Sequence, residues 1–210
     1  MKREAYLAGE IFGRDTLHEI RATIRTAWLY VSRPTFYAPT VAKYEDLRGD
    51  ENSLLAITGR DWVFGNHVTC QQVLSAEQLE QPPAVSCAFA LAALDPQFAR
   101  KVVAGDFIVA GIDFAGDATH RNVPAVLKVL GVSAVIARSF GHFFIRNALH
   151  IGLPALVVEE TGAIRGGDRL RVDIEAHIVA NLSSGDRYVI RNIDDEALTI
   201  LRRNQVTSDQ

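Results

Sequence analysis

The stretch from Phe107 to Ala137 decides the fold, and it reads FIVAGIDFAGDATHRNVPAVLKVLGVSAVIA. It begins with the apolar run FIVAG and ends with the apolar run SAVIA, and both runs are typical of buried strands. Between them, AVLKVL favours a helix, and Gly131 is placed to end that helix. The stretch therefore predicts a strand, a helix and a second strand.

The same pattern continues through residues 138–160. Ser139 is expected to cap a helix over GHFFIRNALHI, Gly152 to stop it, and PALVVEE to form the next strand. Residues 107–160 thus alternate strands with helices. Helical crossovers between apolar strands imply a parallel sheet, so the fold class is α/β with a mostly parallel central sheet.

Further elements are expected on both sides of this core. LLAITGRDWVF has strand-like apolar residues, and an alanine-rich helical region with a short helix before Val102 follows it. Near the C-terminus, apolar and polar residues alternate on both sides of SSGD, which predicts a hairpin. DDEALTILRRN favours a final helix.

The N-terminal segment has a different texture. Thr16 and Glu19 form a capping-box pair ahead of apolar residues at helical spacing, which predicts a helix from Thr16 to Val31. Two prolines and a polar cluster over 33–53 suggest a loop or boundary. We therefore divide the chain into an N-terminal extension, residues 1–55, and a domain of residues 56–210.

Composition excludes several classes of protein. A net charge of −3 over 210 residues gives no reason to expect nucleic acid or an acidic membrane as a partner. No apolar run approaches the ~20 residues of a membrane span, and no secretory signal is visible at the start. Cys70 and Cys87 are expected to be reduced thiols of a cytoplasmic protein. Two thiolates are too few for an iron–sulfur cluster on this chain, which needs about three or more.

Polar residues crowd the link between the first strand and the first helix, GIDFAGDATHRNVP. Ligands collect at the carboxyl ends of parallel strands, where helix N-termini direct amide hydrogens outward. Thr119 or Asp117 is expected to cap the helix, and Arg121 offers a planar fork for a carboxylate. Two interpretations stay open: a site for a small carboxylate or phosphate, or a capped helix with a solvated loop. A Walker loop is disfavoured because Asp117 follows Gly116 where lysine is needed.

Other polar residues suggest less. His67, Thr69, Cys70 and Gln71 fill a second polar loop, and Arg138 and Ser139 follow a buried strand. The histidines show no two-histidine metal spacing, and no triad of catalytic residues stands out.

Three segments carry a resemblance to a known family: GRDWVFGNHV (59–68), DPQFARKVVAGDFIVAGIDF (95–114) and ARSFGHFFIRNALHIGLPAL (137–156). From about Thr58 to Leu201 the chain resembles the small subunit of isopropylmalate isomerase, in the aconitase superfamily. The resemblance implies that residues 56–210 form a swivelling β/β/α domain that closes over a separate large subunit. It also implies a 4Fe–4S cluster on that partner, no cofactor on this chain, and a small hydroxy-carboxylic acid as substrate.

The polar loop GIDFAGDATHRNVP (111–124) departs from the family pattern, which at this place usually reads Asn-Phe-Gly-Cys-Gly-Ser-Ser-Arg-Glu-His. Aligned without gaps on Phe114 and Pro124, the serine base falls on Ala118 and the carboxylate-binding arginine on His120. A shift of one residue instead makes Thr119 the base and Arg121 the clamp. The resemblance thus implies Thr119 as catalytic residue. The residues it implies for substrate binding are His120, Arg121, Asn122, Asp117, Thr69 and Gln71.

Three hypotheses follow. The favoured one is an active small subunit of a hydro-lyase or isomerase that moves water across a carbon–carbon bond of a hydroxy-diacid, with a threonine activated as a base. The second is a non-catalytic structural or regulatory subunit of such a complex, because the usual serine is missing. The third, a free-standing anion-binding module, gives no reason for the close scaffold match.

Overall fold

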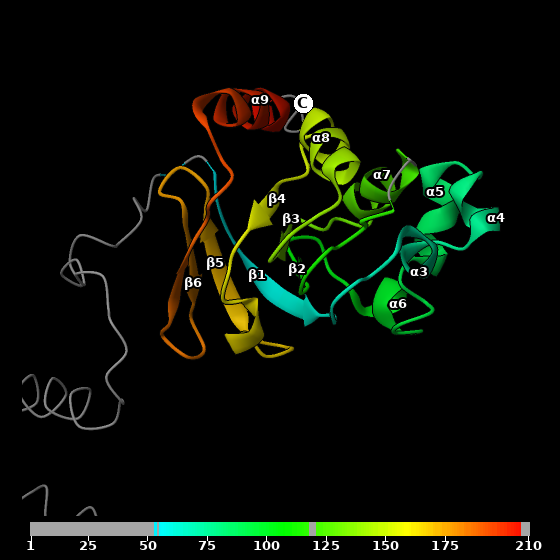
Figure 1. Cartoon of the computed structure of the whole chain (residues 1–210), viewed down its shortest axis with the longest axis horizontal. Coiled ribbons are helices and arrows are strands. Elements are labelled where there is room, and N and C mark those ends of the chain that lie inside the picture. The colour runs from blue at the N-terminus through cyan, green and yellow to red at the C-terminus, as the bar shows by residue number, and fades with distance from the viewer. Residues whose placement is uncertain (1–52, 54, 118–120, 207–210) are drawn as a thin grey trace, which may run out of the picture. The chain divides into compact units, whose positions relative to one another are not determined.

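A computed structural model describes residues 53, 55–117 and 121–206 (Figure 1). The predicted helix from Thr16 to Val31 and nearly all of the N-terminal extension lie outside these residues, as do Thr119 and His120. The boundary at residue 55 therefore stays a prediction.

In this part of the chain, seven strands form one sheet in the order β4-β3-β2-β1-β5-β6-β7. The first four are parallel: β1 (Ala56–Val63), β2 (Phe107–Val109), β3 (Ala134–Ala137) and β4 (Ala155–Val157). The last three are antiparallel: β5 (Arg169–Asp173), β6 (Ile178–Asn181) and β7 (Arg187–Val189). The parallel core and the hairpin around SSGD are confirmed. The antiparallel part is larger than predicted, because β5 pairs directly with β1.

Helices connect and cover the strands. Between β1 and β2 lie α3 (Cys70–Val73), α4 (Ala76–Leu79), α5 (Pro83–Ser86), the 3₁₀ helix η1 (Cys87–Phe89) and α6 (Phe98–Lys101). The crossovers α7 (Asn122–Val129) and α8 (His142–His150) follow β2 and β3. The 3₁₀ helix η2 (Thr161–Ala163) and α9 (Asp195–Val206) complete the set. Two predicted helix stops are confirmed: Gly131 and Gly152 follow α7 and α8 with φ of +86° and +72°.

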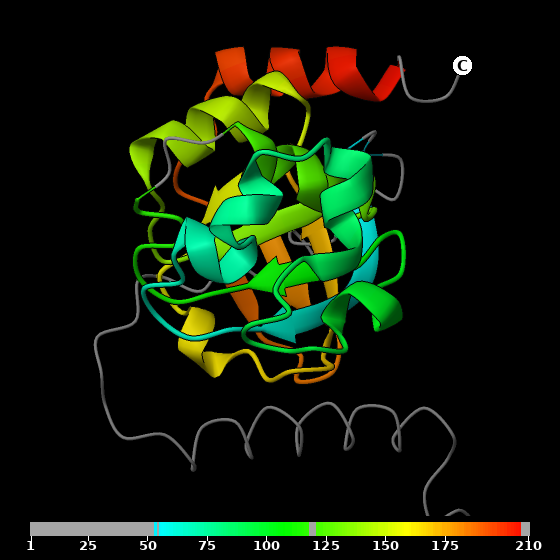
Figure 2. The same cartoon turned by 90° about the vertical axis from the view of Figure 1, so that its right-hand side faces the viewer.

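The sheet separates two hydrophobic cores. On one face, Ile108 and Val135 pack in a cluster with Val126 of α7 and Phe144 of α8. On the other face, Phe107 and Val109 belong to a cluster with residues of β5 to β7 and α9. Figures 1 and 2 show this arrangement, with α3 to α7 on one side of the parallel strands. Burial on both faces explains why β2, β3 and β4 read as unbroken apolar runs. In β1, which joins the antiparallel half, polar residues such as Thr58 and Arg60 are exposed.

None of the helices in the described ranges is long and apolar enough to cross a membrane.

Candidate functional site

Three loops meet at one edge of the sheet. They follow β1 (residues 64–69), β2 (110–117) and β3 (138–141). Because β1, β2 and β3 are parallel, their carboxyl ends lie at the same edge, where ligands of open α/β sheets collect. The first two loops contain the polar residues that were expected at the site from the sequence.

Main-chain hydrogen bonds tie the second loop to the first. The Gly111 N–H donates to the Gly65 carbonyl at 3.1 Å, and the Ala115 N–H donates to the Val68 carbonyl at 2.7 Å. The Asn66 side chain adds a third link, since its Oδ1 accepts from the Ile112 N–H at 2.9 Å. Each link fixes the backbone without using a side chain of the second loop.

The second loop is tied to the third in the same way. The Phe114 N–H donates to the Ser139 carbonyl at 2.9 Å, and the Gly141 N–H donates to the Phe114 carbonyl at 3.0 Å. A side chain at Gly141 would collide with the Ala115 carbonyl, 2.2 Å from the position of a Cβ. Glycine is therefore needed there for the two loops to approach so closely.

The predicted role of Ser139 was wrong. We expected it to cap α8, but the N-cap is Gly141, and no side chain caps that helix. The Ser139 Oγ instead accepts from the Asp113 N–H at 2.8 Å. The chain stays extended through Phe140, which forms a parallel bridge to Phe114, so the helix begins too late for Ser139 to reach its first turn.

Backbone strain concentrates in these loops. His67, Asp113 and Ala115 have φ of 54°, 60° and 52°, in the left-handed region that L-residues with a side chain rarely adopt. In the described ranges only two other non-glycine residues have positive φ. Such strain persists only where the surroundings enforce it, and it clusters at functional sites.

The strained residues bring together a histidine and an aspartate. His67 Nδ1 lies 3.4 Å from Asp113 Oδ2, with 69% and 49% of the two side chains exposed. Asp113 also occupies the space above Gly116, where a Cβ would lie 2.0 Å from its Oδ1. A carboxylate beside an imidazole can orient it for proton transfer. This pair could not be predicted from the sequence, because the two residues are 46 positions apart and form no motif.

The prediction that Asp117 caps α7 was also wrong. The N-cap of α7 is Arg121, and no side chain caps the helix. Asp117 is the last described residue before 118–120, and its Oδ1 accepts a hydrogen bond from the Cys70 N–H at 2.7 Å. It therefore links the second loop to the start of α3. Thr119, the other expected cap, lies outside the described residues.

The first-loop residues have mixed positions. Thr69 is the N-cap of α3 and forms a capping box with Gln72, while Gln71 is exposed on the same helix. Burial raises the pKa of the Cys70 thiol to about 12, and the carboxylate of Asp117 acts in the same direction. Because a thiol must lose its proton to act as a nucleophile or metal ligand, this environment disfavours both roles for Cys70.

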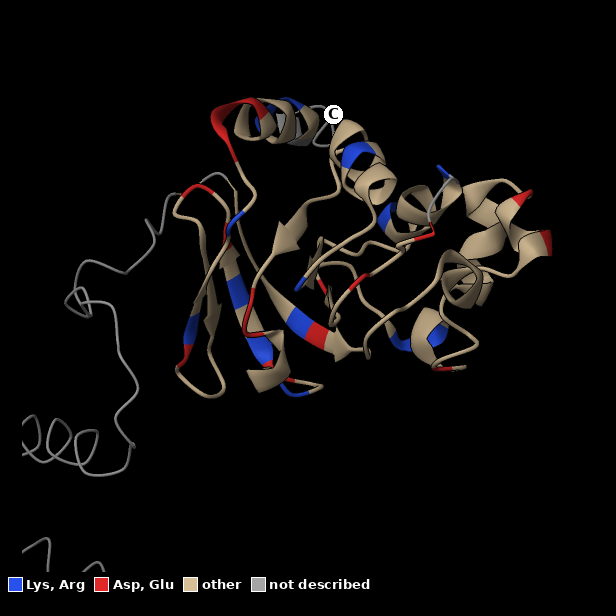
Figure 3. Ribbon diagram, in the orientation of Figure 1, with Lys and Arg blue, Asp and Glu red and all other residues tan. Residues whose placement is uncertain are grey.

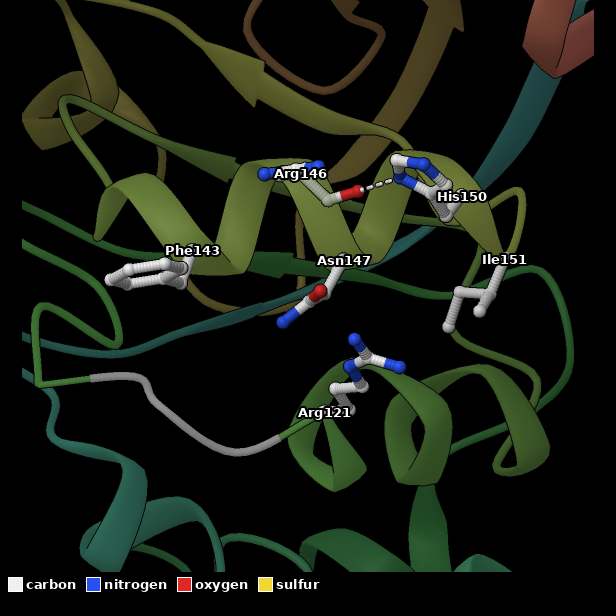
Figure 4. Close-up of a pocket in the computed structure, with 6 residues that line it drawn as sticks. All are labelled: Arg121, Phe143, Arg146, Asn147, His150 and Ile151. Atoms are coloured by element: carbon white, nitrogen blue, oxygen red, sulfur yellow. Dashed lines mark hydrogen bonds between the residues drawn. The ribbon is translucent and has the colours of Figure 1, made fainter.

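Arg121 and Asn122 lie at the start of α7, where their side chains are directed to α8 and to the residues around the end of α4. The Asn122 Nδ2 donates to the carbonyl of Leu79 and to that of Gln81 at 3.3 Å, so it anchors the start of α7. The Arg121 side chain is exposed and directed toward α8 (Figure 4). The structure therefore gathers Thr69, Gln71 and Asp117 around α3 and does not bring Arg121 or Asn122 to them.

Metal ligands do not gather in the part of the chain that the structure covers. Among these residues, no three of His, Cys, Asp and Glu come together in a way that would hold a metal ion.

This architecture, one seven-stranded sheet with a parallel half, an antiparallel half and a hydrophobic core on each face, occurs in a known dehydratase. A solved 3-isopropylmalate dehydratase from Methanocaldococcus jannaschii superposes with a TM-score of 0.66 at 26% identity, covering 73% of this chain and 98% of that one. Small subunit 1 of 3-isopropylmalate dehydratase from Archaeoglobus fulgidus is 36% identical over 146 residues, 69% of this chain and 91% of its own length. The Wolinella succinogenes small subunit is 36% identical over 144 residues, 68% of this chain and 86% of its own.

The chain belongs to the family of 3-isopropylmalate dehydratase small subunits. The resemblance read from the three sequence segments is thereby confirmed. No protein-family model matches the chain.

Proposed function

We propose that this chain is the small subunit of a hydro-lyase that resembles 3-isopropylmalate dehydratase and acts on a hydroxy-diacid in the cytoplasm. Its relatives carry that name and are matched over 86–91% of their own length. The observation that carries the proposal is the set of three loops bound together at the carboxyl edge of β1, β2 and β3. This is where the family keeps its catalytic loop.

The proposed partner is a large subunit that holds a 4Fe–4S cluster. The cluster does not fit this chain, because it has only two cysteines, and burial raises the pKa of Cys70 to about 12, which disfavours its thiolate. On the partner, the cluster would act as a Lewis acid toward the hydroxyl that leaves as water. This chain then needs to supply a base and groups that bind carboxylate.

Thr119 is the first candidate for the base. This assignment uses the alignment shifted by one residue, in which Arg121 takes the place of the family's carboxylate-binding arginine. In that proposal His120 and Arg121 bind a substrate carboxylate, and Thr69 and Gln71, which lie apart from Arg121 at the start of α3, bind the substrate from the first loop. Asp117 and Asn122 contribute by holding the two ends of the loop, since their side chains already bond to backbone groups. Threonine needs an activating neighbour, as serine does.

His67 is a second candidate for the base, and the structure favours it by geometry. Removing a proton beside a carboxylate requires a positioned acceptor, and Ala118 has replaced the serine in the ungapped alignment. With Nδ1–H donating to Asp113, the His67 ring would accept the proton at Nε2. The Asp113 carboxylate would then stabilise the imidazolium that forms.

The deciding experiment measures turnover of isopropylmalate and citramalate by the chain co-purified anaerobically with its large-subunit partner. Thr119→Ala and His67→Ala are compared, and the variant that removes the base is expected to lose at least about a hundredfold in kcat. Asp113→Asn is expected to follow His67→Ala in direction. His177→Ala is the matched control, because His177 also has positive φ, 57°, but lies in the turn between β5 and β6.

Unchanged rates in both Thr119→Ala and His67→Ala would refute the assignment of the base. The departure at Ala118 supports one alternative function, a structural or regulatory subunit. A stable complex whose large subunit carries its cluster, but which turns over no hydroxy-diacid, would favour that alternative.

A further inference from the structure

The outer face of α8 carries a stripe of side chains that the core does not use. Phe143, Arg146, Asn147, His150 and Ile151 follow the i, i+3, i+4, i+7 and i+8 spacing of one helix face. Phe143 is 55% exposed and Ile151 is 39% exposed, one near each end of the stripe. The polar side chains lie between these two apolar ones.

Arg121 at the start of α7 faces this stripe, and together they line a groove of about 450 Å³ (Figure 4). The Arg121 guanidinium and the Asn147 amide point toward one another across it. A volume of this size lies within the ~300–1,000 Å³ typical of sites for small molecules.

The polar lining of the groove is cationic or neutral. Arg121 and Arg146 form no ion pair with a carboxylate in the described ranges. Neither α7 nor α8 contains an aspartate or glutamate, so no acidic residue of these helices neutralises the two guanidinium groups (Figure 3). Guanidinium forks match the geometry of carboxylates, and two guanidiniums in one groove that pair with no carboxylate of the described residues favour an anion.

His150 is held in a fixed orientation beside them. Its Nδ1 lies 2.7 Å from the Arg146 carbonyl, and because a carbonyl only accepts, Nδ1 carries the hydrogen. This leaves Nε2 outside that bond. The contact also joins Arg146 and His150 into one unit on the helix surface.

We propose that the groove between α7 and α8 binds a small carboxylate that carries a hydrocarbon group. The two guanidiniums and the Asn147 amide receive the carboxylate, and Phe143 and Ile151 receive the hydrocarbon. The groove shares Arg121 with the carboxylate clamp proposed above, but its other lining residues belong to α8 and its C-cap, and none belongs to the loops after β1 and β3. It therefore adjoins the proposed hydro-lyase site as a second site, and this inference goes beyond the function proposed above.

The test titrates the full-length chain with malonate, isopropylmalonate and inorganic phosphate, followed by amide chemical shifts. Both diacids are expected to move the amides of residues 121–123 and 143–151. Isopropylmalonate is expected to bind about tenfold more tightly than malonate, since its alkyl group is partly buried. Phe143→Ala should remove that preference.

Arg146→Ala is expected to weaken binding of both diacids by at least about tenfold, as loss of a charge-assisted hydrogen bond does. Arg100→Ala is the matched control, because it removes one exposed arginine from α6, outside the groove, and should leave affinity within about twofold. Equal weakening by both variants would mean unspecific attraction and would overturn the proposal. So would phosphate binding as tightly as isopropylmalonate, or an absence of shifts in these residues.

The test is independent of the hydro-lyase proposal. Binding is measured on this chain alone, so an inactive complex leaves the result intact. In an active complex, Arg146→Ala is expected to leave turnover unchanged while it weakens binding in the groove. Loss of turnover in that variant would contradict the separation of the two sites.

Discussion

The loop after β2 contains two kinds of residue, buried apolar ones and more exposed ones that flank them. Phe114 and Ala115 are fully buried, whereas Asp113 is half-buried and Gly116 and Asp117 are exposed. The buried residues attach the loop to the core, and the others present polar groups at the edge of the sheet. The comparison teaches that anchoring and chemistry are carried by different residues of one short segment, so polar residues can change while the scaffold stays the same.

The largest loss of stability is expected on substitution of Phe114, the buried residue that attaches the loop to the core. Phe114 is 0% exposed, and its ring meets those of Phe140 and Phe144 edge to face at 6.1 and 5.2 Å. Phe114→Ala should lower the free energy of unfolding by about 3–5 kcal/mol, because it leaves a cavity that the core cannot fill. Urea denaturation measures this loss.

Phe143→Ala is the control for that prediction. Phe143 has the same side chain on the outer face of α8 and is 55% exposed, so its loss should change the free energy of unfolding by less than about 1 kcal/mol. Similar losses in the two variants would show that the loop is not anchored through Phe114.

A second effect concerns Asp61, a buried carboxylate on β1 beside the turn that precedes β5. Asp61 is 3% exposed, and neither oxygen has a hydrogen-bond partner in the described ranges. Burial raises its pKa from 3.8 to about 6, against a smaller opposing effect of the Gly167 backbone N–H, and the nearby Asp168 carboxylate also raises it. Between these two pH values the folded state holds a proton that the unfolded state has lost, so stability falls as pH rises and the loss is complete above about pH 6.

Asp61→Asn should remove this loss. We expect the free energy of unfolding to rise by about 1–3 kcal/mol at pH 7.5, the upper limit following from the difference in pKa, and by much less at pH 4. Asp106→Asn is the contrasting variant: Asp106 is also buried, but its Oδ2 accepts from the Trp62 Nε1–H and the Val103 N–H. Because an amide cannot replace all these acceptors, Asp106→Asn should destabilise the protein. Urea titrations at both pH values would contradict the interpretation if Asp61→Asn were destabilising at pH 7.5.

The sequence predicted the parallel core well, because its signals are local. Apolar runs, the helical segment AVLKVL and the stops at Gly131 and Gly152 each depend on a few neighbouring residues. The pairing of β1 with β5 was not predicted, since more than a hundred residues separate the two strands and no local pattern records it. Long-range pairing of this kind follows from the closure of the sheet over its second core.

The candidate site was predicted in place but not in detail. The edge of the sheet follows from the parallel strands, so the gathering of the loops was foreseeable. The caps were wrong because Ser139 and Asp117 have alternative donors in other loops, the N–H groups of Asp113 and Cys70. Short polar side chains bond to whichever backbone group is nearest, and only the folded chain decides which that is.

The smallest change in stability is expected for a substitution that tests the backbone strain at Ala115. Ala115 has φ of 52° where the family motif, aligned on Phe114, has glycine. Ala115→Gly should relieve about 1–2 kcal/mol of steric strain. It should lose about 0.4–1 kcal/mol through the freer unfolded chain and about 0.8 kcal/mol through the buried methyl group. These contributions nearly cancel, so we expect a change within about 0.5 kcal/mol of zero.

Ala125→Gly makes the same chemical change in the interior of α7, where the backbone is unstrained. There the helix propensity alone predicts a loss of about 1 kcal/mol. The informative quantity in urea denaturation is therefore the difference between the two variants, expected to be about 1 kcal/mol in favour of Ala115→Gly. If both lose stability equally, Ala115 is not held in a strained conformation, and the alignment that places the family's glycine there loses its physical support.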